Sequence, residues 1–440
     1  MTKQTISTVV IILLLFQTLK TQTFCGKVKD INGKVVPGTE VYIVEDDETI
    51  LTDAKGKWKY TASKKTTKTL VFFKDGFIYE QLNDQKPSKG INITLRKSKK
   101  SLASIREERY LKDGCSSVTI PDDPNWNIDF EITPLKGDLA PDKNYTRRDP
   151  SSVIKVDGVY YMWYSYSLTF DKTKTAPWDY NDLYYATSTD GITWDEKGMA
   201  VGRGKAGSYD ARSVFTTEIF VNKDKYYLVY QAAADEEGIA GKNTVGMAWA
   251  DNPNGPWTKL DKPVLTPTYT KNIFFDNKSA HDPCIISYNN KFYLYYKGEC
   301  GCMEAEDCIK WCNPACELRK QVKWGVAIAD SPTGPYVKSE FNPITNTGHE
   351  VMVWPYADGV AILQHQDGPE ALSIQYSKDG FNFEIKGKVT GFPEAAGLFR
   401  TKTSDTDPHA GVSWGMGHQL KWNAGPKGWM YIYRFDKKSK

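Results

Sequence analysis

The 440-residue sequence lacks a dominant charge of either sign. Its 57 Lys and Arg residues stand against 54 Asp and Glu residues, for a formal net charge of +3 at pH 7. A protein whose whole surface binds DNA, RNA or anionic lipid needs a strong field of one sign, which this composition does not supply. The balance excludes nucleic-acid binding as the main function.

The sequence also lacks long hydrophobic runs. An eight-residue apolar run, VVIILLLF, spans residues 9–16, whereas a membrane-spanning helix needs about 20 residues. With Lys3 before it, this run is typical of a secretory signal, which we predict over residues 1–24. We therefore expect an exported protein, periplasmic or secreted, with no membrane span. Cys25 follows directly, but Thr23-Phe24 lacks the small residue that lipid-modification signals carry, so a lipid anchor is the less favoured alternative.

Low-complexity segments are absent as well, and aromatic residues are abundant. The chain has 13 Trp, 26 Tyr and 18 Phe residues, which excludes a disordered or collagen-like chain because there is ample surface to bury. Aromatic residues are enriched in β-strands. The composition predicts β-structure, and flat rings could also serve as platforms for a sugar.

Five of the eight cysteines fall in one short segment. In an exported protein such clustering favours a disulfide-stapled insertion, and the spacing is not one of the usual paired C-x2-C zinc patterns. The pairing cannot be derived from the sequence. The five residues are Cys300, Cys302, Cys308, Cys312 and Cys316.

Residues 25–98 alternate short strands with Asp/Gly turns, a pattern that predicts a small β-sandwich. This unit resembles the carboxypeptidase-regulatory-like domain, which usually acts as a spacer or docking module, and it contains no catalytic cluster. A basic stretch, RKSKKS over residues 96–101, is typical of a linker.

One aromatic strand pattern recurs five times at nearly constant intervals. Equivalent positions are 160, 226, 292, 360 and 429, separated by 66 to 69 residues. An Asp/Gly turn and a second aromatic strand follow most copies, which makes about four strands in each repeat. This arithmetic predicts a five-bladed β-propeller over residues 121–440, so the whole chain is expected to be all-β.

Counting back about ten residues from each repeat should reach the innermost strand of each blade. The positions found are Asp149, Thr216 to Glu218, Asp282, Glu350 and His418-Gln419, with His281 and His349 directly before two of them. Carboxylates facing one cavity are what glycoside hydrolysis requires, because one group activates water and another protonates the leaving oxygen.

Four short motifs in this region resemble those of glycoside hydrolase family 117. They are Arg147-Arg148-Asp149-Pro150-Ser151, Ser279-Ala280-His281-Asp282-Pro283, Gly348-His349-Glu350, and an S-x-A-x-x-R element made by Ser101, Ala103 and Arg106. The resemblance covers about residues 100–440. Family 43 shares the five-bladed architecture and its three carboxylates but lacks the last two motifs.

The resemblance implies an exo-acting, inverting hydrolase that releases terminal 3,6-anhydro-α-L-galactose from neoagaro-oligosaccharides, which are neutral. Asp149 matches the general base and His349 the general acid, while Glu350 and Asp282 match carboxylates that orient the substrate and tune the acid. Imidazole has a pKa near 6.5, and a neighbouring carboxylate favours its protonated form, so such an acid is chemically reasonable. Substrate contacts are expected from His281, Thr216, Gln231, Trp178 and His418.

Residues 101–111 predict a helix that ends near Gly114, within a linker segment over 99–120. In the family this segment builds a homodimer, so Ser101, Ala103 and Arg106 are expected to act in dimerisation. No cofactor or metal is required, although a divalent cation near the site is compatible with its acidic residues. Three alternatives stay open: another red-algal oligosaccharide as substrate, a family 43-like arabinosidase or xylosidase with a Glu donor, and a non-catalytic sugar-binding propeller.

Overall fold

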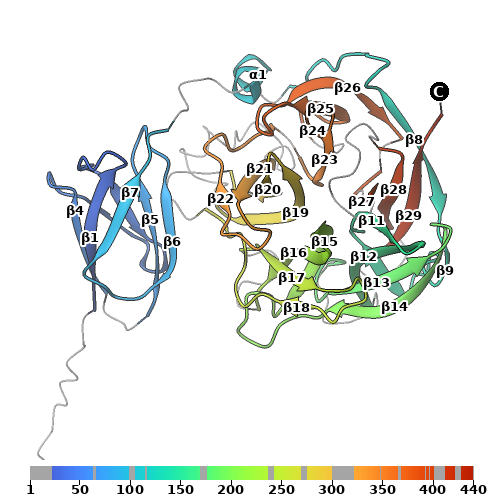
Figure 1. The fold of residues 1–440 in the computed structure, drawn as a ribbon, viewed down its shortest axis with the longest axis horizontal. Coiled ribbons are helices and arrows are strands. Elements are labelled where there is room, and N and C mark those ends of the chain that lie inside the picture. The colour runs from blue at the N-terminus through green and yellow to red at the C-terminus, as the bar shows by residue number, and fades with distance from the viewer. Residues whose placement is uncertain are drawn as a thin grey trace, which may run out of the picture. The chain divides into compact units, whose positions relative to one another are not determined.

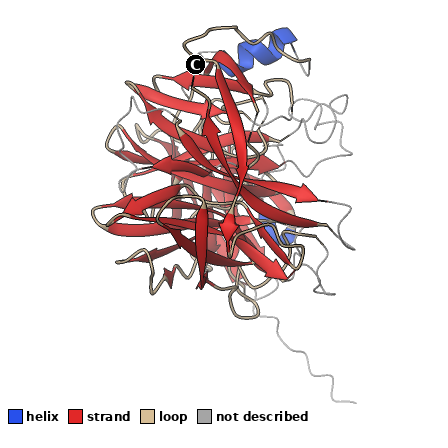
Figure 2. Cartoon of the chain, turned by 90° about the vertical axis from the view of Figure 1, so that its right-hand side faces the viewer, coloured by secondary structure: helices blue, strands red, loops and turns tan. Residues whose placement is uncertain are grey.

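The structure, a computed structural model, contains two compact units, residues 1–98 and 99–440. Strands make up nearly all of its regular structure (Figure 2), which confirms the all-β prediction. The residues that the structure describes are 22–62, 66–98, 105–113, 116–168, 176–235, 242–268, 275–299, 322–346, 348–364, 368–391, 393–395, 397–400, 412–421 and 428–439. Cys115 and the segment Cys300–Cys316, in which disulfides are predicted, lie outside these ranges. Among the described residues, no helix is long and apolar enough to cross a membrane.

The first unit is a sandwich of two sheets, with strand orders β4-β1-β7 and β3-β2-β5-β6. In β4 and β7 exposed and buried residues alternate strictly, because one face of the sheet packs on the core and the other meets water. The elements are β1 (Gln22–Asp30), β2 (Glu40–Ile43), the 3-10 turn η1 (Val44–Asp46), β3 (Glu48–Leu51), β4 (Lys57–Ala62), β5 (Lys68–Phe73), β6 (Glu80–Gln85) and β7 (Ile91–Leu95).

Strand β1 begins at Gln22, before the expected end of the signal at residue 24. Phe24 is fully buried, and its ring centroid lies 6.3 Å from that of Tyr60 across the β1–β4 pair. The first strand of the sandwich thus includes residues that the sequence pattern assigns to the signal.

The second unit is a β-propeller whose described strands lie around a common centre (Figure 1). They form two four-stranded sheets and one longer continuous sheet, which we divide into three further groups of four, numbered along the chain. The first group is β11 (Val153–Val156), β12 (Val159–Leu168), β13 (Asp182–Ser188) and β14 (Thr193–Val201); the second is β15 (Ser213–Asn222), β16 (Lys225–Ala233), β17 (Thr244–Ala250) and β18 (Thr258–Lys259); the third is β19 (Ser279–Tyr288), β20 (Lys291–Glu299), β21 (Lys323–Ala329) and β22 (Val337–Lys338). The fourth is β23 (Met352–Tyr356), β24 (Gly359–Leu363), β25 (Ser373–Ser377) and β26 (Glu384–Thr390), and the fifth is β27 (Gly397–Arg400), β28 (Trp414–Lys421), β29 (Trp429–Lys437) and β8 (Ile128–Pro134).

The fifth group closes the ring, because its outermost strand, β8, comes from the start of the propeller and pairs antiparallel with β29. Two short strands, β9 (Lys136–Gly137) and β10 (Tyr145–Arg148), pair with β14 and β12. In the first four groups the repeated aromatic strand is the second one. In the fifth group it is β29, the third strand, so the predicted equivalence of position 429 with the other four is wrong by one strand.

Helix α1 (Ile105–Asp113) confirms a short helical segment in this region, and residues 101–104 of the predicted helix lie outside the described residues. Two of its arginines bind the propeller of the same chain. Arg106 Nη1 donates to Asn346 Oδ1 at 3.2 Å, and Arg109 Nε pairs with Glu370 Oε1 at 3.0 Å. Ser101 and Ala103 lie outside the described residues.

Candidate active site

Three inner strands of the propeller are interrupted at the same level. Asp149, Thr216 and Asp282 all have a left-handed backbone, with φ of 47°, 45° and 46°. The β15–β16 register skips Thr216, the β19–β20 register skips Asp282, and Asp149 lies between β10 and β11, which both pair with β12. Such bulges re-aim a side chain out of the sheet, and strained backbone of this kind clusters at functional sites.

The bulges bring the Asp149 carboxylate into contact with the second group of strands. Thr216 Oγ1 donates to Asp149 Oδ2 at 2.9 Å, Ser165 Oγ donates to it at 3.3 Å, and Arg148 Nη1 lies 2.5 Å away. Oδ1 has no hydrogen-bond donor in the part of the chain that is described. Asp149 is therefore held by one oxygen, while the other keeps its hydrogen-bonding capacity. Thr216, which is expected to contact sugar, positions Asp149 through this hydrogen bond.

His418 completes this arrangement from β28. Its Nδ1 accepts a hydrogen bond from the backbone N–H of Asp149 at 3.0 Å and lies 3.2 Å from Oδ1 of the same residue. Because a ring nitrogen that accepts from the amide cannot also donate, the ring proton lies on Nε2. The His418 side chain, expected to contact substrate, thus stabilises the strained backbone at Asp149.

Glu350 and His349 enter the site just before β23. His349 Nδ1 lies 3.2 Å from Glu350 Oε1, and the His349 side chain is 41% exposed while Glu350 is buried. Burial alone would raise the pKa of Glu350, but His349 and then Lys297 hold it well below its usual range. Gly348 before them has φ of 147°, and a Cβ there would lie 2.1 Å from Nε1 of Trp324. Only glycine fits this approach.

Asp282 forms a buried ion pair with Lys297 of β20. Burial, then the nearby Glu350 carboxylate, raises the pKa of Asp282 to about 6, against the opposing effect of Lys297. Burial lowers the pKa of Lys297, but Asp282 and Glu350 outweigh that effect and raise it. The pair stays close because neither charge has water to solvate it.

His281 is buried beside this pair, and burial followed by the charge of Lys297 lowers its pKa well below the usual range. The ring is therefore neutral near pH 7. Gln231 Nε2 contacts His281 Nδ1 at 3.1 Å, so Nδ1 accepts and the proton lies on Nε2, which is buried and has no hydrogen-bond partner in the described ranges. Gln231 therefore hydrogen-bonds to His281, and the Nε2–H of His281 stays available as a donor.

A second polar layer lies a few residues further along the inner strands. Glu218 accepts from the backbone N–H of Ser152 at 2.8 Å, and Arg400 Nη2 lies 3.5 Å from its Oε1. The same Nη2 donates to the Val353 carbonyl at 2.6 Å and lies 3.7 Å from Cys284 Sγ. This linking layer, defined as Ser152, Glu218, Cys284, Val353 and Arg400, joins the inner strands of all five groups.

Trp178, the expected platform, is half-buried. The Arg148 guanidinium lies 5.7 Å from the centre of its ring, and its carbonyl accepts from Ser213 Oγ at 3.0 Å.

Sequence reasoning assigned no role to Arg148, Ser165, Lys297 or Arg400. For Lys297 a signal was available, since a lysine inside the apolar strand FYLYYKG is rarely buried without a partner.

Asp149, Glu350 and His418 each offer one ligand atom, and these three atoms lie within 4.8 Å of one another. Two carboxylates and an imidazole form a donor set that suits a divalent transition metal. In this arrangement only the two carboxylates offer lone pairs to a cation, because His418 Nδ1 accepts from the Asp149 amide and its Nε2 carries the ring proton.

Comparison with known proteins places this site in a family. Residues 139–313 match the glycosyl hydrolases family 32 N-terminal domain. The solved structure of Zg3597, a family 117 glycoside hydrolase produced by the marine bacterium Zobellia galactanivorans, shares 36% sequence identity with a TM-score of 0.62, and the match covers 72% of this chain and 92% of that one. This chain belongs to glycoside hydrolase family 117.

Family 117 membership makes the protein a glycoside hydrolase by descent and agrees with its propeller fold. Another solved glycoside hydrolase shares 12% sequence identity with a TM-score of 0.50, and that match covers 70% of this chain and 92% of the other. At this identity the likeness shows a similar fold alone. None of the curated proteins compared with this chain matches it.

Proposed function

We propose that this family 117 protein is an exo-acting, inverting hydrolase of the α-1,3 linkage that releases terminal 3,6-anhydro-α-L-galactose from neoagaro-oligosaccharides. The observation that carries the proposal is an ionised Glu350 beside a partly exposed His349, close to an Asp149 with one free oxygen. Inversion needs one group to deprotonate water and another to protonate the leaving oxygen.

Asp149 is the general base in this scheme. Its Oδ2 is held by Thr216, Ser165 and Arg148, so Oδ1 remains to accept the proton of the attacking water. As that proton moves to Oδ1, the water oxygen bonds to the anomeric carbon and the glycosidic bond breaks. Fixing one oxygen and leaving the other free orients the base toward a single direction of attack.

His349 is the general acid, and Glu350 positions it. A Glu donor of the family 43 type would need a raised pKa, whereas the pKa of Glu350 lies well below its usual range. The nearest oxygens of Asp149 and Glu350 are also within 4.8 Å, less than the roughly 6.5–9.5 Å that an inverting carboxyl pair requires. Protonated His349 gives its proton to the leaving oxygen, and Glu350 stabilises the imidazolium beforehand.

Asp282 and His281 bind and orient the sugar. The Nε2–H of His281 is a buried donor without a partner among the described residues, and a substrate hydroxyl or ring oxygen would satisfy it. Asp282, when ionised against Lys297, can accept from a hydroxyl. A divalent cation held by the carboxylates of Asp149 and Glu350 would supply a positive charge to orient sugar oxygens.

The test is release of 3,6-anhydrogalactose from neoagarobiose by the purified protein. We expect turnover by the wild type, with the anomeric configuration inverted in the first product by NMR. His349→Ala should lose about 10²- to 10⁴-fold in kcat, the usual contribution of a general acid. A wild type that cleaves no neoagaro-oligosaccharide overturns the substrate, and full activity in His349→Ala overturns the acid assignment.

Other expectations from the sequence stay proposals and need their own measurements. Export over residues 1–24 is tested by the mass of the mature N-terminus, and the disulfides of the Cys300–Cys316 segment by peptide mapping under non-reducing conditions. The homodimer rests on the family resemblance of Ser101, Ala103 and Arg106, and light scattering of the purified protein tests it. The sandwich as a carboxypeptidase-regulatory-like domain likewise remains a proposal.

A further inference from the structure

One face of the amino-terminal sandwich is basic and has no carboxylate at the outward positions of its strands. In the sheet β4-β1-β7, outward positions alternate with core positions, and the outward side chains are Thr23, Cys25, Lys27, Lys29, Lys57, Lys59, Thr61, Asn92 and Thr94. Lys27 and Lys57 stand directly opposite each other, as do Cys25 and Lys59. Like charges in direct cross-strand pairs destabilise a sheet, so this arrangement costs stability instead of supplying it.

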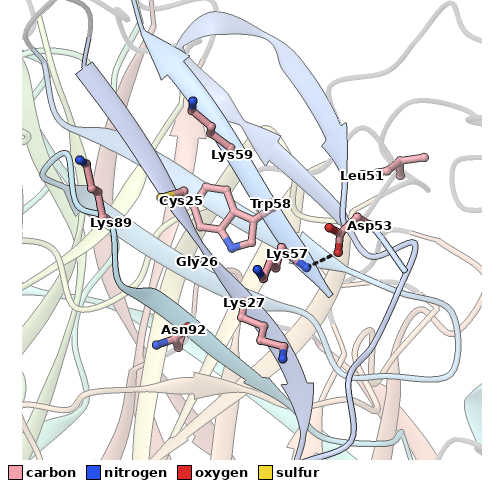
Figure 3. Close-up of a pocket in the computed structure, with 10 residues that line it drawn as sticks. All are labelled: Cys25, Gly26, Lys27, Leu51, Asp53, Lys57, Trp58, Lys59, Lys89 and Asn92. Carbon is pink, nitrogen blue, oxygen red and sulfur yellow. Dashed lines mark hydrogen bonds between the residues drawn. The ribbon is translucent and has the colours of Figure 1, made fainter. Parts of the chain in front are cut away.

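The lysines surround an open concavity of about 480 Å³ (Figure 3). Lys27, Lys57, Lys59 and Lys89 line it, and no ion pair with a described carboxylate neutralises any of the four. The nearby Asp53 accepts the backbone N–H groups of Lys57 and Lys55, each at 2.8 Å. These backbone hydrogen bonds, that of Lys57 first, lower the pKa of Asp53, so its charge stabilises the turn.

Asp53 lines the concavity, whereas two other acidic residues of this unit lie in the opposite sheet. Glu45 and Asp46 lie in η1, at the end of β2 in the other sheet, where Asp46 pairs with Lys68 at 2.7 Å. The outward face of the sheet β4-β1-β7 therefore holds Lys27, Lys29, Lys57 and Lys59 and no outward carboxylate on its strands. Strands lie about 4.8 Å apart and same-face residues about 7 Å apart along a strand, so the ammonium groups form a grid.

We propose that this basic face binds an anionic polysaccharide, with a sulfated galactan chain as its ligand class, and holds the hydrolase close to polymer. The concavity is open and does not enclose a single small anion. Its cationic residues are lysines, and it has no arginine that could bind one anion through two parallel hydrogen bonds. Such a site suits a chain with repeated charges. A glycan is favoured over a lipid surface because the same chain carries a glycoside hydrolase domain, and no outward apolar side chain on these three strands would enter a bilayer.

Binding of the full-length protein to a sulfated galactan, an unsulfated galactan of equal length, and phosphatidylcholine–phosphatidylglycerol vesicles tests the proposal. We expect the sulfated chain to bind, with affinity falling steeply between about 50 and 200 mM salt as counterions are released. Lys57→Glu with Lys59→Glu should weaken binding about tenfold or more. The matched control, Lys34→Glu with Lys86→Glu, makes the same charge change at exposed positions outside the concavity and should weaken it less than about threefold.

Equal loss in both double variants, no binding to sulfated galactan, or tighter binding to vesicles than to galactan would each overturn the proposal. Turnover of neoagarobiose by both variants should match the wild type, because none of the four lysines belongs to the propeller. If the wild type cleaves no neoagaro-oligosaccharide but still binds the sulfated chain, the proposed substrate fails and the basic face stands.

Discussion

In the candidate site of the propeller, the charged side chains are buried and contact cationic or imidazole groups. In the sandwich, the lysines of the basic face have no ion pair with a described carboxylate. Asp149, Glu350 and Asp282 are each less than 9% exposed and each contacts a cationic or imidazole group. Lys57 and Lys59 are exposed and face water. Burying a charge is costly, so each buried one must be paired and thereby fixed in direction, while exposed charges act through their pattern.

The largest effect is expected at the free oxygen of the buried base. Asp149→Asn keeps the shape and the contacts to Thr216 and Arg148 but cannot take a proton, so kcat should fall about 10³-fold or more. Thr216→Val is the matched variant, because it removes one of the three groups that hold Oδ2 and should cost about tenfold. Steady-state kinetics on neoagarobiose measures both. Similar losses in the two variants would mean that Asp149 acts through its position alone.

A change in the linking layer should affect stability more than chemistry. Glu218→Gln removes the charge that faces buried Arg400, and breaking such a pair costs about 3–5 kcal/mol. Its control is Lys225→Gln, which breaks the exposed pair Lys225–Asp251 and should cost less than about 1 kcal/mol. Chemical denaturation compares them. Equal denaturation midpoints for the two variants would show that the buried pair contributes no more to stability than the exposed pair.

Phe24→Ala should destabilise the sandwich and spare the propeller. Truncating a fully buried Phe costs about 3–5 kcal/mol, so the first thermal transition should fall while neoagarobiose turnover stays unchanged. The exposed Leu51→Ala serves as control in the same unit. If export removed every residue through Phe24, the mature variant would be identical to the wild type, and calorimetry would show no shift.

The pH dependence of activity should follow Asp282. Because its pKa is raised to about 6, the folded protein keeps a proton there that the unfolded chain releases near pH 4, so this group's stabilising contribution declines as pH rises from about 4 to 6. Its ionised form, needed to accept from substrate, accumulates above pH 6. We expect kcat/KM to fall below pH 6, and Lys297→Gln to move that limb to higher pH. If the acidic side of the pH profile does not move in Lys297→Gln, a group other than Asp282 sets it.

The smallest effect is expected on the basic face. Lys57→Ala should change the sandwich melting temperature by less than about 2 °C, or raise it slightly, because it relieves repulsion from Lys27. Lys68→Ala, which breaks the buried pair with Asp46, should lower it clearly. Calorimetry of the full-length protein measures both. A marked loss in Lys57→Ala would show that this lysine stabilises the sheet.

Much of the architecture could be predicted from the sequence, because strand patterns and turns are local. The near-constant spacing of the aromatic strands predicted the propeller, and the offset of ten residues reached Asp149, Thr216, Asp282 and Glu350. His418 was found for a wrong reason. It lies on β28, the second strand of the fifth group, and not on an innermost strand, because the aromatic repeat at position 429 is on the third strand.

The sequence by itself determined the all-β class, the repeat and the family motifs, because periodicity and residue type are properties of neighbouring positions. Only the tertiary structure decided how the charged groups act. It put Thr216 and His418 on Asp149, Gln231 on His281, and Lys297 on Asp282. These contacts join residues up to 269 positions apart. Pairing and burial determine the pKa of each group and which oxygen of Asp149 lacks a hydrogen-bond donor. Both depend on distances between residues far apart in the sequence, which no local pattern encodes.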